Sequence, residues 1–276
     1  MVASLKNLES PLGKSDVKLS PLGLGTVKFG RNEKVKYPGH FEIPDEDFLR
    51  DFLDLAKSLG ITTLDTAPAY GASEERLGRL LKRDRDEWTI IAKAGEYFKD
   101  GESFYDFSSQ SIERSLHSSL KKLDTSYVDV FLLHSDGRDK DILADKDLLD
   151  KLYQFKAQGL IKACGISSKT VEGGLKGIDL LDCVMATYNP FYKEEEPVLK
   201  EAERKKKGII LKKALASGHL DKINAPDPVQ ASLSCAYGQP SVSSVIIGTI
   251  HPEHLRSNVR AALKAIHARH PKAASL

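Results

Sequence analysis

The stretch Ile61-Thr-Thr-Leu-Asp65-Thr-Ala-Pro-Ala-Tyr70-Gly-Ala-Ser-Glu74 joins an apolar run, typical of a buried strand, to an aspartate and then to a tyrosine. Two further apolar runs end similarly: Ile90-Ile-Ala-Lys93 closes on a lysine and Val128-Asp-Val-Phe-Leu-Leu-His134 on a histidine. Each of these end residues can carry or move a proton. Because the active sites of (β/α)8 barrels lie at the carboxyl ends of their strands, the pattern predicts one site assembled from three βα units.

Short apolar runs alternate with charged segments of helical periodicity along the chain. Eight such runs separated by helices favour an α/β fold with a closed parallel sheet, a (β/α)8 TIM barrel. The glycine-rich segment 169–180 carries only a weak helical pattern. The predicted strands lie at 22–26, 61–65, 88–93, 128–134, 161–166, 183–187, 208–212 and 244–248, and the helices at 46–59, 73–83, 108–123, 147–159, 195–207, 228–237 and 252–268.

An open, doubly wound sheet is the alternative to a barrel. It requires a glycine fingerprint after the first strand, but Gly23-Leu-Gly25 is followed by Lys28 where the third glycine belongs. Residues 4–19 carry Gly13-Lys14-Ser15-Asp16 between short mixed runs and predict an N-terminal β-hairpin across the barrel floor. The chain shows no Pro/Ser-rich linker, so we expect residues 1–276 to form a single domain.

Bulk composition excludes several classes of function. The 41 Lys and Arg residues nearly balance the 39 Asp and Glu residues, which argues against nucleic acid or membrane partners. Cys164, Cys183 and Cys235 are odd in number and widely spaced, so we expect free thiols, no disulfide and no metal site. No apolar run has the length of a signal-peptide core or of a membrane span, and the expected location is the cytoplasm.

The four strand-end residues match the needs of carbonyl reduction. Hydride addition to a carbonyl requires a proton donor for the developing alkoxide. The ordinary pKa of tyrosine is about 10, and a neighbouring ammonium lowers it toward the working range. Lys93 is the candidate ammonium, Asp65 can hold it in place, and His134 can donate a hydrogen bond that orients the substrate oxygen.

Each of these residues also has an ordinary structural interpretation. An aspartate or lysine at a strand end is commonly part of a salt bridge, and a histidine after an apolar strand is commonly packed in the core. A tyrosine in a turn can simply pack there. The four together, in this order and in these elements, favour the catalytic interpretation.

The last predicted strand leads into a candidate phosphate site. Ser243-Ser-Val-Ile-Ile-Gly248-Thr249 runs into His251-Pro252-Glu253, where Pro252 suits the first position of a helix. A helix N-terminus offers free N–H groups and partial positive charge to a phosphate, and barrels often bind phosphate after their seventh and eighth strands. A plain capped helix is the alternative.

Taken together, these segments resemble the aldo-keto reductases, in particular short, bacterial-type members. The motif D-T-A-x-x-Y-G-x-S-E is complete over 65–74, and the segments ending at Lys93 and His134 match in order and spacing. The resemblance implies a TIM barrel with a floor hairpin, Tyr70 as general acid, Lys93 and Asp65 tuning it, and His134 orienting the substrate. It extends through Leu22-Gly-Leu-Gly-Thr26, Cys164-Gly-Ile-Ser-Ser168 and Ile247-Gly-Thr-Ile-His-Pro-Glu-His-Leu-Arg-Ser-Asn258.

The resemblance also implies a nicotinamide cofactor. Gly248, Thr249, His254 and Asn258 fall on positions that hold the adenosine end of NADP(H), with Asn258 facing the adenine. Members commonly place Lys or Arg near Thr249 or His254 for the 2′-phosphate, whereas this chain offers His254 with Arg256 and Arg260 nearby. We expect NADP(H), with NAD(H) as the alternative. The remaining implied cofactor contacts are Thr26, Ser167, Ser168, Lys212, Leu215 and Ser217.

The nicotinamide end departs from the family pattern. The usual Ser-Asn pair becomes Ser167-Ser168, a usual glutamine falls at Met185, and the usual stacking aromatic falls near Lys212. Lys212 is expected to reach the pyrophosphate. Its alternative is a solvated charge that continues the run Lys205–Lys207.

The expected substrate is a small carbonyl compound in an open pocket, and the protein is expected to be a monomer or a weak homo-oligomer. Specificity contacts should come from Lys28 to Phe41 and from Tyr97-Phe98, with Phe29, Phe98 and Tyr188 either lining an apolar mouth or packing at the rim. The sequence shows no anion-binding cluster. Two alternatives to a reductase remain: a cofactor-binding, redox-sensing barrel with little turnover, and a sugar or polyol dehydrogenase that works in the oxidative direction.

Overall fold

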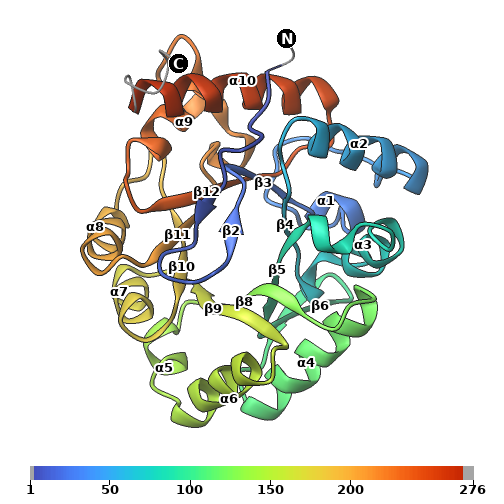
Figure 1. The fold of residues 1–276 in the computed structure, drawn as a ribbon, viewed down its shortest axis with the longest axis vertical. Coiled ribbons are helices and arrows are strands. Elements are labelled where there is room, and N and C mark those ends of the chain that lie inside the picture. The colour runs from blue at the N-terminus through green and yellow to red at the C-terminus, as the bar shows by residue number, and fades with distance from the viewer. Residues whose placement is uncertain (1–2, 270–276) are drawn as a thin grey trace.

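In the computed structural model, which describes residues 3–269, eight parallel strands close into a barrel with helices outside it (Figure 1). Each strand starts within two residues of its predicted start, and the predicted fold class is confirmed. Closure leaves no sheet edge unpaired, and the carboxyl ends of all eight strands meet at one mouth. In barrel order, the strands are β3 (Leu22–Gly25), β4 (Thr63–Asp65), β5 (Thr89–Ala94), β8 (Val128–His134), β9 (Ile161–Ser167), β10 (Cys183–Thr187), β11 (Gly208–Lys212) and β12 (Val242–Ile247).

The predicted N-terminal hairpin is confirmed. Strands β1 (Ser10–Pro11) and β2 (Lys18–Leu19) pair antiparallel, and β2 lies within the outline of the barrel in Figure 1. Leu12, Val17 and Leu19 are buried in one cluster with inward-facing barrel residues, among them Ile91 and Val130. The hairpin therefore closes the floor, and the opposite mouth is left for a site.

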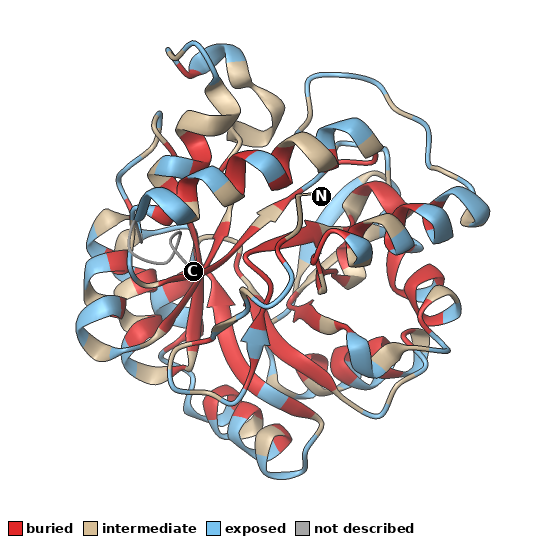
Figure 2. Cartoon of the chain, turned by 45° about the horizontal axis from the view of Figure 1, so that its top comes forward, coloured by how far each residue is buried: buried red, intermediate tan, exposed pale blue. Residues whose placement is uncertain are grey.

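The helices surround the barrel and bury one face each (Figure 2). Several begin with the side-chain caps that satisfy free N–H groups: Asp45 caps α2, Ser108 caps α4, Asp145 caps α6 and Asp227 caps α9. The longer helices are α2 (Glu46–Ser58), α3 (Ser73–Leu80), α4 (Ser109–Lys122), α6 (Lys146–Ala157), α7 (Val171–Leu180), α8 (Glu196–Lys205), α9 (Pro228–Tyr237) and α10 (Pro252–Arg269).

The glycine-rich segment is helical as α7, and its glycines allow close packing. A β-carbon at Gly174 would lie 2.7 Å from Cγ2 of Val198, and one at Gly177 would lie 2.7 Å from Cγ2 of Ile166. Thr170 caps the helix by accepting from the amide of Gly173. Close packing against β9 and α8 thus compensates for the low helix propensity of glycine.

Several short elements near the mouth carried no periodic signal in the sequence. The most prominent is an antiparallel hairpin of β6 (Glu96–Lys99) and β7 (Glu102–Tyr105) directly after β5. Short helices follow other strands: α1 (Val27–Gly30), η1 (Pro68–Tyr70), α5 (Asp139–Ile142), η3 (Ala216–Gly218) and η4 (Leu220–Lys222). A further short helix, η2 (Arg85–Glu87), lies directly before β5 and away from the mouth.

Two sequence expectations concern the whole chain. The three cysteines are free, with Cys164 and Cys183 buried. Across residues 3–269, no helix is both long and apolar enough to cross a membrane.

Candidate active site

Asp65, Tyr70 and Lys93 meet beneath the barrel mouth. The Lys93 ammonium donates hydrogen bonds to Oδ1 of Asp65, to the Thr66 carbonyl at 3.0 Å and to the Tyr70 hydroxyl at 3.2 Å. The ring of His134, at the end of β8, lies edge-on to that of Tyr70 with 6.3 Å between centroids. The structure thus brings together the four residues that the sequence singled out.

The turn that carries Tyr70 depends on its glycine. Pro68 starts the single turn η1, and Gly71 ends it with a φ of +62°. A β-carbon at Gly71 would overlap the carbonyl oxygen of Gly30, so this position needs glycine for both its conformation and its close packing. The turn fixes the tyrosine against α1.

Burial changes the expected proton affinity of Tyr70. Burial raises the pKa of Tyr70 to about 12, and the opposing effect of the Lys93 ammonium does not overcome it. Lys93 lowers this pKa as expected, but burial outweighs it, so the net pKa of Tyr70 in the protein alone lies above its ordinary value. Burial lowers the pKa of Lys93, but Asp65 and Tyr70 outweigh it and the net change is upward, so the ammonium stays charged.

His134 contacts a carboxylate that the sequence analysis did not identify. Its Nδ1 lies 2.9 Å from Oε2 of Glu96, an ion-pair contact rather than an aligned hydrogen bond. Burial lowers the pKa of His134, while Glu96 opposes that change. Burial alone would raise the pKa of Glu96, but His134, the Ser103 hydroxyl and the charge of Arg31 bring it to about 2. Glu96 is therefore ionised and favours a proton on Nδ1.

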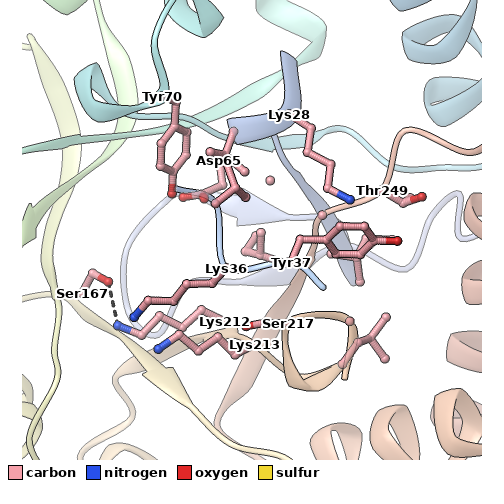
Figure 3. Close-up of a pocket in the computed structure, with 18 of the residues that line it drawn as sticks. Lys28, Lys36, Tyr37, Asp65, Tyr70, Ser167, Lys212, Lys213, Ser217 and Thr249 are labelled. Carbon is pink, nitrogen blue, oxygen red and sulfur yellow. Dashed lines mark hydrogen bonds between the residues drawn. The ribbon is translucent and has the colours of Figure 1, made fainter. Parts of the chain in front are cut away.

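A cavity of about 660 Å³ extends from these residues to the N-terminus of α10 (Figure 3). Its wall includes all four strand-end residues. Of the expected cofactor contacts, it includes Ser167, Lys212, Leu215, Ser217, Gly248, Thr249, His254 and Asn258.

The two other expected contacts lie behind this wall. The Thr26 hydroxyl donates to the Asp65 carbonyl at 3.0 Å and shares a hydrogen bond with Ser73. The Ser168 hydroxyl donates to Glu195 at 3.4 Å. Both residues are fully buried. Their hydroxyl groups therefore support neighbouring elements.

Lys212 points into the cavity region rather than into solvent. Its ammonium donates to Oγ of Ser167 at 2.9 Å and to the Ser168 carbonyl at 2.6 Å, and Figure 3 shows the first of these bonds. Burial lowers the pKa of Lys212 to about 7, against the opposing charge of Glu195. The alternative that Lys212 continues the solvated run 205–207 does not hold.

A buried lysine, Lys28, stands near the α10 end of the cavity. It follows β3 in α1, and Figure 3 shows its ammonium directed toward Thr249. The ammonium lies 3.2 Å from the centroid of the Tyr37 ring, and burial lowers its pKa to about 8. The expected arginines do not line this part of the wall: Arg256 pairs with Glu253 at 3.8 Å, and Arg260 is exposed.

Two of the three aromatics expected at the mouth lie elsewhere. Phe29 is fully buried and packs edge-on against Phe52, and Tyr188 is buried with its hydroxyl accepting from Gln239. Phe98, on β6, does lie near the mouth, beneath the guanidinium of Arg31. Phe29 belongs to the core because α1 turns its side chain toward Phe52 of α2.

Comparisons with known proteins agree with this fold. Residues 21–232 match the model of the aldo/keto reductase family. A crystal structure described as an aldo-keto reductase of Pseudomonas aeruginosa is 48% identical, with a TM-score of 0.87 over 95% of this chain and 98% of that one. A Bacillus subtilis protein, the uncharacterized oxidoreductase YqkF, is 28% identical over 91% of this chain and 90% of its own length. An NADH-specific methylglyoxal reductase of Escherichia coli is 28% identical over 65% of this chain and 58% of its own.

Proposed function

Because the chain belongs to the aldo-keto reductase family of oxidoreductases, we propose that it reduces a small aldehyde or ketone to an alcohol, with Tyr70 as general acid. The observation that carries this proposal is the position of the Lys93 ammonium, between Asp65 and the Tyr70 hydroxyl in the wall of a large cavity. A buried ion pair is costly to desolvate, and a catalytic role explains its place at a barrel mouth.

Each residue has a distinct task in the proposed reaction. Tyr70 gives its proton to the substrate oxygen as negative charge develops there, and Lys93 stabilises the resulting tyrosinate. Asp65 holds the Lys93 ammonium. His134 orients the carbonyl from Nε2, which donates only when the ring is protonated, since Glu96 favours a proton on Nδ1.

The cavity fits a nicotinamide dinucleotide. When bound, the cofactor supplies the hydride. Near the four strand-end residues, the wall holds Met185 and the Ser167 hydroxyl. At its far end the wall holds Thr249, Asn258 and the start of α10, where a phosphate meets free N–H groups. Gly248 leaves open space, because a β-carbon there would contact nothing within 4 Å.

We further propose that the cofactor is NADP(H) rather than NAD(H). Lys28 and His254 both line the far end of the cavity, and Lys28 supplies there the cation that was expected from Arg256 or Arg260. The similarity to an NADH-specific methylglyoxal reductase makes NAD(H) the alternative. Since lining residues come from Gly25 to Asn258, the whole barrel acts as a single domain in this proposal.

The proton affinity of Tyr70 suits it to the role of proton donor in reduction. With a pKa of about 12, the hydroxyl is protonated throughout the neutral range and is ready to donate. Oxidation of a sugar or polyol would need tyrosinate as the base, a form that burial disfavours.

Titration of the purified protein with NADPH and, in parallel, NADH tests the cofactor assignment, with protein fluorescence as the readout. Tight NADPH and weak NADH binding is expected. Consumption of NADPH with methylglyoxal and a panel of simple aldehydes then tests reduction. Binding of neither cofactor, or binding without multiple turnover on any carbonyl, would overturn the proposal, and the second result would favour a redox-sensing barrel.

A further inference from the structure

The cavity wall is strongly cationic. Apart from Lys93, seven of its described residues are Lys or Arg, whereas the acidic residues Asp65 and Glu96 already contact Lys93 and His134. Figure 3 shows the ammonium groups of Lys36, Lys212 and Lys213 on one side. The phosphates of a dinucleotide carry about two to four negative charges. The cavity wall therefore keeps a net positive charge when the cofactor is bound.

Among the described residues, Arg31 has no counter-ion in direct contact. Its Nε and Nη1 are covered by protein, and neither has a hydrogen-bond partner among residues 3–269. Among residues 3–269, no carboxylate oxygen lies within 4.0 Å of a guanidinium nitrogen of Arg31, the distance that defines an ion pair. A partly buried guanidinium without a counter-ion in contact is costly, and a nearby oxyanion would offset its charge.

The Arg31 guanidinium is also held in place. It stacks on the ring of Phe98 with 4.1 Å between its central carbon and the ring centroid. Its backbone amide donates to the Val27 carbonyl at 2.9 Å, which ties the residue to the end of α1. A guanidinium fixed in this way has lost side-chain freedom before any ligand binds, which favours binding.

Arg31 stands at the catalytic end of the cavity. It lines the wall together with Tyr70, Glu96 and Tyr105, and its charge is close enough to act on all three. Lys28, by contrast, is directed toward Thr249 at the cofactor end. Arg31 is therefore placed to meet the substrate.

We infer that Arg31 receives an oxyanion carried by the substrate, so that the carbonyl compound reduced here is an aldehyde or ketone with a carboxylate or phosphate group. The inference rests on the proposed function and names its substrate class. The oxyanion meets Nη2, the guanidinium nitrogen outside the covered pair, and a charge-assisted hydrogen bond to this nitrogen suits a carboxylate and a phosphate alike. Lys36 and Lys169 add positive potential that draws such a substrate to the mouth.

Matched substrate pairs test this inference with NADPH as reductant. Butanal is compared with 4-oxobutanoate, and glyceraldehyde with glyceraldehyde 3-phosphate. The wild type is expected to show at least tenfold higher kcat/KM for the anionic member of one pair, and that pair identifies carboxylate or phosphate. Arg31→Gln should remove roughly 10- to 100-fold from the anionic member alone, and Arg31→Lys should restore part of it.

Lys82→Gln is the matched control, because it removes an exposed positive charge from a distant loop. It should leave the anionic preference unchanged. The inference is overturned if neither pair shows a preference, if Arg31→Gln lowers both members equally, or if that change mainly weakens NADPH binding.

A binding measurement separates this inference from the proposed function. Succinate, a non-reducible analogue of 4-oxobutanoate, and inorganic phosphate are titrated calorimetrically into the NADP⁺-loaded protein. Binding of either ion that Arg31→Gln removes supports the oxyanion site even if no carbonyl is reduced. Absence of binding by both ions, together with turnover of neutral aldehydes, leaves the reductase intact and overturns the oxyanion site.

Discussion

The ammonium of Lys93 lies 3.2 Å from the hydroxyl of Tyr70, yet the pKa of that hydroxyl is raised to about 12. Burial of the phenol outweighs its charged neighbour, which itself contacts Asp65. Lys93 therefore does little to release the proton beforehand. Its contribution comes once Tyr70 has given the proton away, when the tyrosinate needs a counter-charge.

Tyr70 should consequently titrate above ordinary tyrosines. We expect the ultraviolet difference between the wild type and Tyr70→Phe to show no tyrosinate from this residue below about pH 10. Because only the protonated form donates, reduction should not decline through loss of this proton between pH 7 and 9. A tyrosinate signal in that range that is absent from Tyr70→Phe would show that Lys93 prevails over burial.

Glu96 should set the charge of His134. Glu96→Gln removes a neighbour that raises the pKa of His134, so the pKa should move further below its ordinary value. If reduction needs the protonated ring, its rate should begin to fall at a lower pH in Glu96→Gln than in the wild type. NMR titration of the His134 ring and pH profiles of kcat measure both effects. An unchanged His134 pKa would mean that the 2.9 Å contact does not carry charge coupling.

Lys212 should make cofactor binding dependent on pH. We propose that its ammonium attracts the cofactor phosphates. Because its pKa is lowered to about 7, this positive charge is lost as pH rises through neutrality. The Kd for NADPH should increase from pH 6 to pH 8 in the wild type. Lys212→Met should bind roughly tenfold or more weakly at pH 6 and lose that part of the pH dependence. Equal pH dependence in both proteins would remove Lys212 from the phosphate contacts.

Asp129 should be important for stability but not for chemistry. The buried carboxylate contacts Arg85 at 3.1 Å, Lys162 at 2.7 Å and the Ile90 amide at 2.9 Å, on the outer side of β8. Asp129→Ala should lower the free energy of unfolding, measured in urea, by roughly 3 kcal/mol, because it leaves the partly buried guanidinium of Arg85 without its carboxylate partner. The half-exposed ammonium of Lys162 can be hydrated instead, so its loss of the carboxylate should cost little. The exposed control Glu253→Ala should change the free energy of unfolding by less than about 0.5 kcal/mol. Equal effects of both changes would contradict this role.

The barrel could be predicted because its strands are continuous apolar runs bounded by charged segments. The position of Tyr70 could be predicted from the motif around Gly71, because only glycine fits the turn that follows the tyrosine. The hairpin of β6 and β7 was missed because its residues are half exposed and show no clear alternation. Glu96 lies on that hairpin, so its contact with His134 was missed with it.

The cationic wall was invisible in the sequence for a different reason. Arg31, Lys169 and Lys212 are far apart in the chain and belong to different βα units, and only closure of the barrel brings them to one cavity. Burial depth was equally hidden. It turned the pKa of Tyr70 upward, and it placed the hydroxyl groups of Thr26 and Ser168 behind the wall.

The central claim is that Tyr70 donates the proton in carbonyl reduction. Single-turnover oxidation of bound NADPH by an aldehyde, followed by absorbance at 340 nm, tests it most directly in the wild type and in Tyr70→Phe. Tyr70→Phe should bind NADPH as the wild type does and lose roughly 10²- to 10⁴-fold in rate. A rate in Tyr70→Phe equal to that of the wild type would contradict the account.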